Sequence, residues 1–314
     1  MNKSNINGGG RGLFNKISGI SIIGDVINHG KREYWDPSKN MHYHATLQAG
    51  ENTLEAQLVR VLMKSIVANN GDFNADHFRS SYIEFMTKPK SHNDAYASTC
   101  HRMFFANMIF KKLPPAQCPD NDSHNVDTID GLVLPTIAAL AVSAKNGNTN
   151  ESKEAARKAS AEVCSVTRRS DKLEKASKIW SDIIFNTLYL SESSEEDLSN
   201  TLNEAGRALG TNRSIRADRI DEMSACYLDQ SFPPTLDMIL KYDKKKDVWT
   251  GLVANANVGG ENVHRGAILG AVLGEAAGVH NLPSKLISGL YDKENISKEI
   301  DAFVEVVLNQ GEVC

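Results

Sequence analysis

Two short polar strings in this 314-residue chain carry residue types that could bind a metal ion. Residues 50–53 place a carboxylate, an amide and a hydroxyl in a row at a predicted helix start, and such oxygen atoms are ligands of hard cations. In the second string, Gly259 and Gly260 precede Glu261 at another predicted helix start, where the backbone could approach an anion or a sugar closely. Each string is equally an ordinary capping arrangement with an acidic residue at the positive end of a helix dipole. Residue types alone leave both interpretations open.

Other candidate residues have plainer interpretations. Asp25 follows an apolar stretch and could be buried or could lie in a turn, and Asp36 before proline is typical of a turn. His101 lies near two phenylalanines on a predicted helix, which indicates a packed or capping histidine rather than a ligand. No phosphate-binding loop, dinucleotide fingerprint or nucleophile elbow occurs.

Helical periodicity dominates the elements that must position these residues. Apolar residues recur at three- and four-residue steps, whereas strand and hairpin signals are almost absent. The segment 128–145 is apolar nearly all round, which is typical of a buried central helix. We predict one all-α domain over residues 11–314 after a flexible tail, residues 1–10. The predicted helices span residues 51–70, 74–86, 94–112, 128–145, 152–166, 171–189, 195–209, 236–242, 247–257, 262–278 and 297–309.

Composition favours a soluble, intracellular protein. A net charge of −4 without a basic stripe argues against stable nucleic-acid binding. Five dispersed cysteines without a C-x-x-C pair indicate reduced thiols in the cytoplasm. The N-terminus lacks the pattern of a signal peptide, and we expect no membrane partner.

Several segments in order along the chain form a recognisable combination: residues 23–25, 34–40, 50–57, 101–107, 130–135, 258–278 and 282–283. Taken together, they resemble the ADP-ribosylglycohydrolase family, and most closely its branch of jellyfish J-type lens crystallins. The resemblance implies an orthogonal bundle of many helices with a central cleft. It also implies, for active members, two magnesium ions that assist cleavage of the bond between ADP-ribose and an amino-acid side chain.

The resemblance also implies which residues would bind the metals. The family's ligands lie in a Thr-Asp-Asp-Thr string and a Gly-Gly-Asp-x-Asp-Thr string. In this chain these fall on Gly50, Glu51, Asn52 and Thr53, and on Gly259, Gly260, Glu261, Asn262, Val263 and His264.

This ligand set departs from the family pattern at four acidic positions. Glu51 and Glu261 keep a carboxylate but move it outward by one methylene, whereas Asn52 removes a charge and Val263 removes a ligand. Magnesium requires near-octahedral oxygen ligands at about 2.1 Å, so both kinds of change weaken the site. His264 replaces a hydroxyl with an imidazole, which would suit a softer metal. Restoring aspartate at positions 52 and 263 would test this interpretation.

Three functions follow from the degenerate site. The first is a structural eye-lens crystallin without efficient hydrolase activity and without a cofactor, as a monomer or weak homo-oligomer. The second is a magnesium-dependent hydrolase that removes ADP-ribose from protein side chains, with Glu51 and Glu261 as its catalytic residues. The third is a pseudoenzyme that binds ADP-ribose or an ADP-ribosylated protein, with Gly259 and Gly260 at the phosphates.

Overall fold

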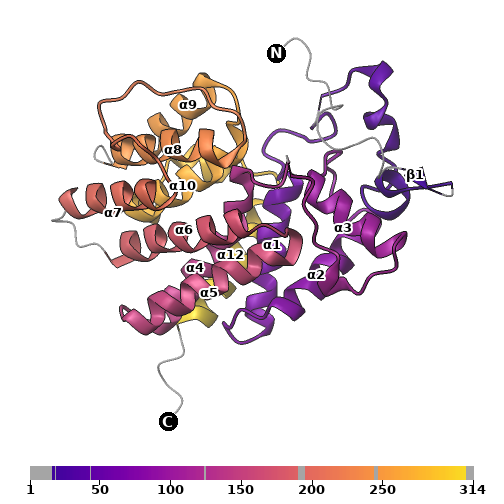
Figure 1. Ribbon diagram of the computed structural model, residues 1–314, viewed down its shortest axis with the longest axis horizontal. Helices are drawn as coiled ribbons and strands as arrows, with labels where there is room; N and C mark the ends of the chain where they lie inside the picture. The colour runs from indigo at the N-terminus through magenta and orange to yellow at the C-terminus, as the bar shows by residue number, and fades with distance from the viewer. Residues whose placement is uncertain are drawn as a thin grey trace. The chain divides into compact units, whose positions relative to one another are not determined.

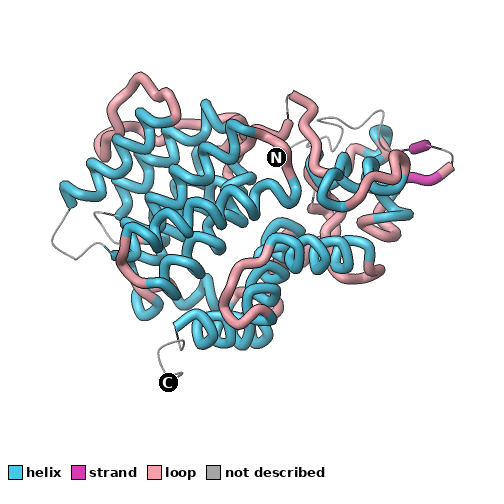
Figure 2. Tube along the Cα trace, turned by 60° about the horizontal axis from the view of Figure 1, so that its bottom comes forward, coloured by secondary structure: helices cyan, strands magenta, loops and turns pink. Residues whose placement is uncertain are grey.

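The computed structural model describes residues 16–17, 19–42, 44–123, 125–189, 195–243 and 247–308. The predicted tail, residues 1–10, lies outside the described residues. Helices make up most of the described part (Figure 1), where the only sheet is the hairpin of β1 (Lys16–Ile17) and β2 (Ile20–Ser21), drawn in magenta in Figure 2. The prediction of an all-α helical bundle is confirmed.

The chain folds into two compact units, each assembled from segments that are distant in sequence. Unit 1 contains residues 1–126, 165–170 and 289–306, and unit 2 contains residues 127–164, 171–288 and 307–314. The single domain expected over residues 11–314 stays a prediction.

Unit 1 is built around a pair of helices at its N-terminal end. Helix α1 packs against α2, and α3 packs against the short turn η1. Its elements are η1 (Ile22–Val26), η2 (Arg32–Trp35), η3 (Pro37–Lys39), α1 (Leu54–Ala68), α2 (Ala75–Thr87), α3 (Thr99–Ile109), η4 (Pro115–Gln117) and most of α12 (Lys293–Leu308).

Helix α1 shows how this unit holds its segments together. Its apolar stripe, which includes Leu58, Leu62 and Ile66, is fully buried, as expected for an amphipathic helix. From the same helix, Arg60 donates hydrogen bonds from Nε and Nη2 to the two carboxylate oxygens of Glu299 on α12, at 2.6 and 2.8 Å. Such a bidentate pair fixes both direction and distance, so it anchors the C-terminal helix of the unit.

Unit 2 is centred on α10, which packs against α4, α6, α8 and α9. Helices α4, α6 and α7 lie side by side in this unit (Figure 1), α6 between the other two. Its elements are η5 (Ile129–Leu132), α4 (Val133–Asn146), most of α5 (Asn150–Thr167), α6 (Asp171–Tyr189), α7 (Glu195–Ala208), α8 (Leu228–Asp243), α9 (Val248–Val258), α10 (Val263–Ala277), η6 (Val279–Asn281) and α11 (Ser284–Ser288).

The apolar segment around α4 begins differently from the prediction. Its first turn is the 3-10 turn η5, and the α-helix starts only at Val133. Pro135, in the first turn of α4, has no N–H to bond backwards, which is tolerated only near a helix start. The window Ile129–Asn146 is also long and apolar enough to cross a membrane, but 56% of it is buried within the protein, as in a core helix.

Helix α3 starts five residues later than the predicted start at Asp94. The backbone before it is occupied by side chains from elsewhere: Trp35 Nε1 donates to the Ala95 carbonyl at 2.8 Å, and Arg102 Nε to the Ala97 carbonyl at 3.2 Å. Asp94 itself caps α1, since its Oδ2 accepts from the Leu54 N–H at 2.8 Å. These tertiary contacts override the local helical pattern.

Helix α8 starts eight residues earlier than predicted and continues through Pro233 and Pro234. Each proline lacks a donor and normally ends a helix. Burial of Phe232, Leu236 and Ile239 in the same helix stabilises it despite these losses. The short helix α11 was not predicted from the sequence.

Candidate functional site

Glu51 lies just before α1, and its carboxylate accepts hydrogen bonds from other residues of the chain. Its Oε2 accepts hydrogen bonds from the Gln48 N–H at 2.9 Å and from Asn93 Nδ2 at 3.1 Å. Asn93 Oδ1 in turn accepts from Lys31 Nζ at 2.9 Å. An ammonium, an amide and a carboxylate therefore form a connected chain at the position expected for a metal ligand.

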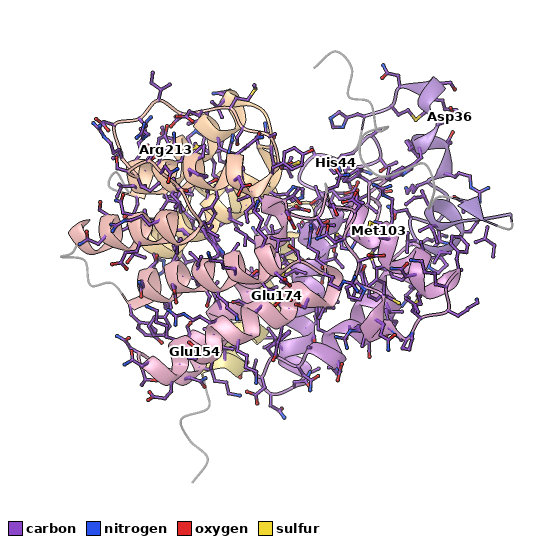
Figure 3. All side chains as sticks on the ribbon, in the orientation of Figure 1. Asp36, His44, Met103, Glu154, Glu174 and Arg213 are labelled. Carbon is purple, nitrogen blue, oxygen red and sulfur yellow. The ribbon has the colours of Figure 1, made fainter. Side chains whose placement is uncertain are left out.

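The start of α1 is a capping arrangement. Thr53 Oγ1 accepts from the Ala56 N–H at 3.4 Å, and Asp94 accepts the Leu54 N–H. Asp94 is nearly fully buried and also bonds His44 Nδ1 at 2.9 Å through its Oδ1, with His44 labelled in Figure 3. Sequence reasoning missed Asp94 because nothing local marks it as a cap for a distant helix.

A cavity of about 350 Å³ lies beside Glu51 and Asn52 within unit 1. Its remaining lining comes from α1, from the loop after α2, from the segment before η2 and from the segment before α12. The lining residues are His29, Lys31, Glu51, Asn52, Gln57, Lys90, Ser91, His92, Asn93, Tyr291 and Asp292. Burial lowers the pKa of His92 to about 4, so this histidine is neutral at pH 7.

A buried polar chain lies one turn further along α1. Glu55 Oε1 accepts from Ser98 Oγ at 2.9 Å and pairs with His101 Nε2 at 3.0 Å, while His101 Nδ1 bonds the Tyr82 hydroxyl at 2.8 Å. Burial alone would lower the pKa of His101, but Cys100, Tyr82 and Glu55 outweigh it and hold this pKa well above its usual value. The expectation that His101 is a packed histidine is confirmed.

In unit 2, Glu261 caps the helix that carries His264. Its Oε1 accepts from the His264 backbone N–H at 3.1 Å and pairs with the His264 Nδ1 atom at 3.0 Å. Val263, between them, is 46% exposed and offers no ligand atom in its side chain. In this string the Glu261 carboxylate therefore stabilises the start of α10 and also contacts the His264 ring.

An extended segment around Cys226 connects this string to Asp130. The Glu261 N–H donates to the Ser224 carbonyl at 2.9 Å, and the Ile129 N–H donates to the Cys226 carbonyl, also at 2.9 Å. A ligand atom of Asp130 lies within 4.8 Å of one of His264. Burial, with the charges of Asp130 and Glu261, raises the pKa of Cys226 to about 11.

Arg265 is the most deeply buried charged group at this end of α10. It is fully buried, and its Nε donates to Asn255 Oδ1 at 2.6 Å and its Nη1 to Ser224 Oγ at 2.8 Å. Its Nη2 donates to the Gly259 carbonyl at 3.1 Å. Sequence reasoning missed this residue, because an arginine beside a helix start normally indicates solvent exposure.

The paired glycines have distinct structural roles. Both have positive φ values, 76° for Gly259 and 68° for Gly260. A Cβ at Gly260 would lie 2.3 Å from the Ser224 carbonyl oxygen, so a close backbone approach explains this glycine. Phosphate binding by the pair stays a prediction.

The weaker candidates are surface features. Asp25 is exposed and pairs with Arg32, so the buried alternative is wrong. Asp36 (Figure 3) caps a short turn, in which its Oδ1 accepts the Ser38 N–H at 2.9 Å, as a turn starter should.

The two strings by themselves do not supply the anionic ligands that two magnesium ions would need. Glu51 and Glu261 already accept hydrogen bonds within their own units, and the ammonium of Lys31 reaches Glu51 through one amide. Magnesium dehydrates reluctantly and needs anionic oxygens in near-ideal octahedral geometry, and Asn52 and Val263 supply no charge.

Comparison with known proteins agrees with the helical architecture. A solved structure described as an "ADP-ribosylglycohydrolase-related protein complex" aligns with a TM-score of 0.57 and 15% identity over 82% of each chain, which shows a shared fold. No curated protein matches the sequence. The family model described as ADP-ribosylglycohydrolase matches residues 19–312. The chain therefore belongs to the ADP-ribosylglycohydrolase family.

Proposed function

We propose that this chain is a non-hydrolysing member of its family and serves as a structural protein of the eye lens, in the cytoplasm and without a cofactor. One observation supports the proposed loss of hydrolysis. Both carboxylates that remain in the two ligand strings, Glu51 and Glu261, serve as hydrogen-bond acceptors for the chain's own backbone and side chains. The lens role is supported by the resemblance to the crystallin branch.

The loss of hydrolysis is tested by calorimetric titration of the purified protein with magnesium chloride and then with ADP-ribose. Release of ADP-ribose from ADP-ribosyl-arginine and ADP-ribosyl-serine is followed in parallel, with an active family hydrolase as positive control. We expect no magnesium heat and no release above buffer. Tight binding of two magnesium ions, or turnover above buffer, would overturn the proposal.

The structural role has its own test, because a lens protein must stay dispersed when crowded. A net charge of −4 favours mutual repulsion of the molecules near neutral pH. Static light scattering at rising concentration should show scattering per unit mass that falls steadily. A rise, which indicates attraction and self-association, would contradict the structural role while leaving the loss of hydrolysis intact.

Recognition of ADP-ribose without hydrolysis is the second candidate function. The observation that favours it is the cavity beside Glu51 and Asn52, whose volume of about 350 Å³ falls within the range of small-molecule pockets. Magnesium-independent binding of ADP-ribose in the same titration would support this candidate over a purely structural role.

A further inference from the structure

The charges around the unit 1 cavity do not cancel. Of its two lining carboxylates, Asp292 accepts from Arg60 Nη2 at 2.7 Å, so a cation already balances it. Lys31, Lys90 and Glu51 remain. Two ammonium groups facing one carboxylate make the cavity cationic, which repels a metal ion and attracts an anion.

The remaining carboxylate serves as an anchor for one of these lysines. The Glu51 carboxylate accepts a hydrogen bond from Asn93 Nδ2, and Asn93 Oδ1 accepts one from Lys31 Nζ at 2.9 Å. A further bond from Asn93 Nδ2 to the Thr46 carbonyl fixes the same amide. An ammonium fixed in this way is pre-organised, so less side-chain entropy is lost when a ligand binds.

Neutral donors complete the lining. Asn52 contributes an amide and Ser91 a hydroxyl. Phosphate groups are bound by such mixtures of cations and neutral donors.

We propose that the unit 1 cavity is an anion site, in which Lys31 and Lys90 bind the phosphate groups of a small phosphorylated molecule. This proposal does not depend on the structural role in the lens. It extends the second candidate function, recognition of ADP-ribose, by naming the phosphate groups as the part of the ligand that the cavity would bind. The resemblance implies that residues at positions 50–53 bind cations in active family members. In this chain the cavity beside these residues would instead bind anions.

The test is calorimetric titration of the full chain with inorganic pyrophosphate in buffer that contains a metal chelator. We expect one binding site, and about a tenfold loss of affinity in each of Lys31→Met and Lys90→Met, because each removes one nearby charge. Lys88→Met is the matched control: it removes an exposed lysine two residues from Lys90 that does not line the cavity, and it should change the affinity less than twofold. Circular dichroism verifies the fold of each variant.

A second variant separates an anion site from a weakened cation site. Glu51→Gln keeps an acceptor for Asn93 but removes the negative charge, so pyrophosphate affinity should rise about threefold or more. Absence of pyrophosphate binding, an equal loss in Lys88→Met, or weaker binding in Glu51→Gln would each overturn the anion site. Turnover of ADP-ribosyl substrates would overturn the proposed loss of hydrolysis alone, so the two failures are distinguishable.

Discussion

The carboxylates at positions 51 and 261 each accept a hydrogen bond from a nearby backbone N–H, at 2.9 and 3.1 Å. The residue types and their order in the sequence were sufficient to predict that these strings lie at helix starts. The partners were not predictable, because Asn93 and Lys31 come from other loops and only the folded chain brings them to Glu51. The capping interpretation of both strings agrees with the observed bonds.

Arg265 should matter more to stability than any surface arginine. Replacement by alanine leaves Asn255 Oδ1, Ser224 Oγ and the Gly259 carbonyl without their donor in a buried setting. We expect Arg265→Ala to lower the free energy of unfolding by about 3 kcal/mol in urea denaturation. Arg207→Ala, an exposed arginine on α7, should cost less than about 0.5 kcal/mol, and equal losses would contradict the assignment.

Glu275 on α10 predicts a dependence of stability on pH. Both of its carboxylate oxygens are buried without a hydrogen-bond partner among the described residues, and burial raises its pKa to about 8. A raised folded-state pKa gives stability that is complete below the unfolded-state value of 4.5 and is lost as pH rises towards 8.

Glu275→Gln should therefore match the parent protein closely at pH 4.5 and be more stable by about 4 kcal/mol at pH 8, measured by urea denaturation at both values. The exposed Glu305→Gln on α12 serves as control and should differ by less than about 0.5 kcal/mol at either pH. A pH-independent difference for Glu275→Gln would show that its carboxyl is not neutral in the fold.

At the scale of elements, periodicity predicted the long helices but not all of their ends. The missed ends have particular causes. Trp35 and Arg102 occupy the carbonyls before α3, and packing of Phe232 and Leu236 carries α8 past its prolines. Such boundaries depend on residues far away in sequence, so no local pattern contains them.

Gly50, in the turn before α1, has a matched control in Gly30, which lies in the turn before η2. Gly50 has φ +77°, and a Cβ there would lie 1.9 Å from the Gly289 carbonyl oxygen, whereas Gly30 has φ +74° and open space around it. Gly30→Ala should cost only the conformational strain, about 1 kcal/mol, and Gly50→Ala about 3 kcal/mol, measured by urea denaturation. Similar costs would mean that the close approach of residues 50 and 289 is not maintained in solution.

At the scale of the whole molecule, the order of moderately specific segments predicted the family, and the match over residues 19–312 confirms it. The division into two units was not predicted, since it follows from contacts between distant segments. The chain passes from one unit to the other at residues 126–127, 164–165, 170–171, 288–289 and 306–307. Neither unit is therefore one continuous stretch of the sequence.

Because the chain passes repeatedly between the two units, we predict a single cooperative unfolding transition. Trp35 belongs to unit 1 and Trp180 to unit 2, and both are buried, so each reports on its own unit. In a variant that keeps only Trp35 and in another that keeps only Trp180, fluorescence and circular dichroism should give coincident midpoints within each variant on urea unfolding. Two separated midpoints would show that the units unfold independently and that residues 11–314 are not one domain.

The hydrogen-bonded chain of Lys31, Asn93 and Glu51 also limits which residues position 51 can hold. An aspartate there would draw the carboxylate back by one methylene, away from Asn93, and would leave Lys31 with a less firmly held partner. Positions 31, 51 and 93 therefore form one set, in which a change at any member alters what the other two must be. Side-chain length at position 51 matters here as much as charge.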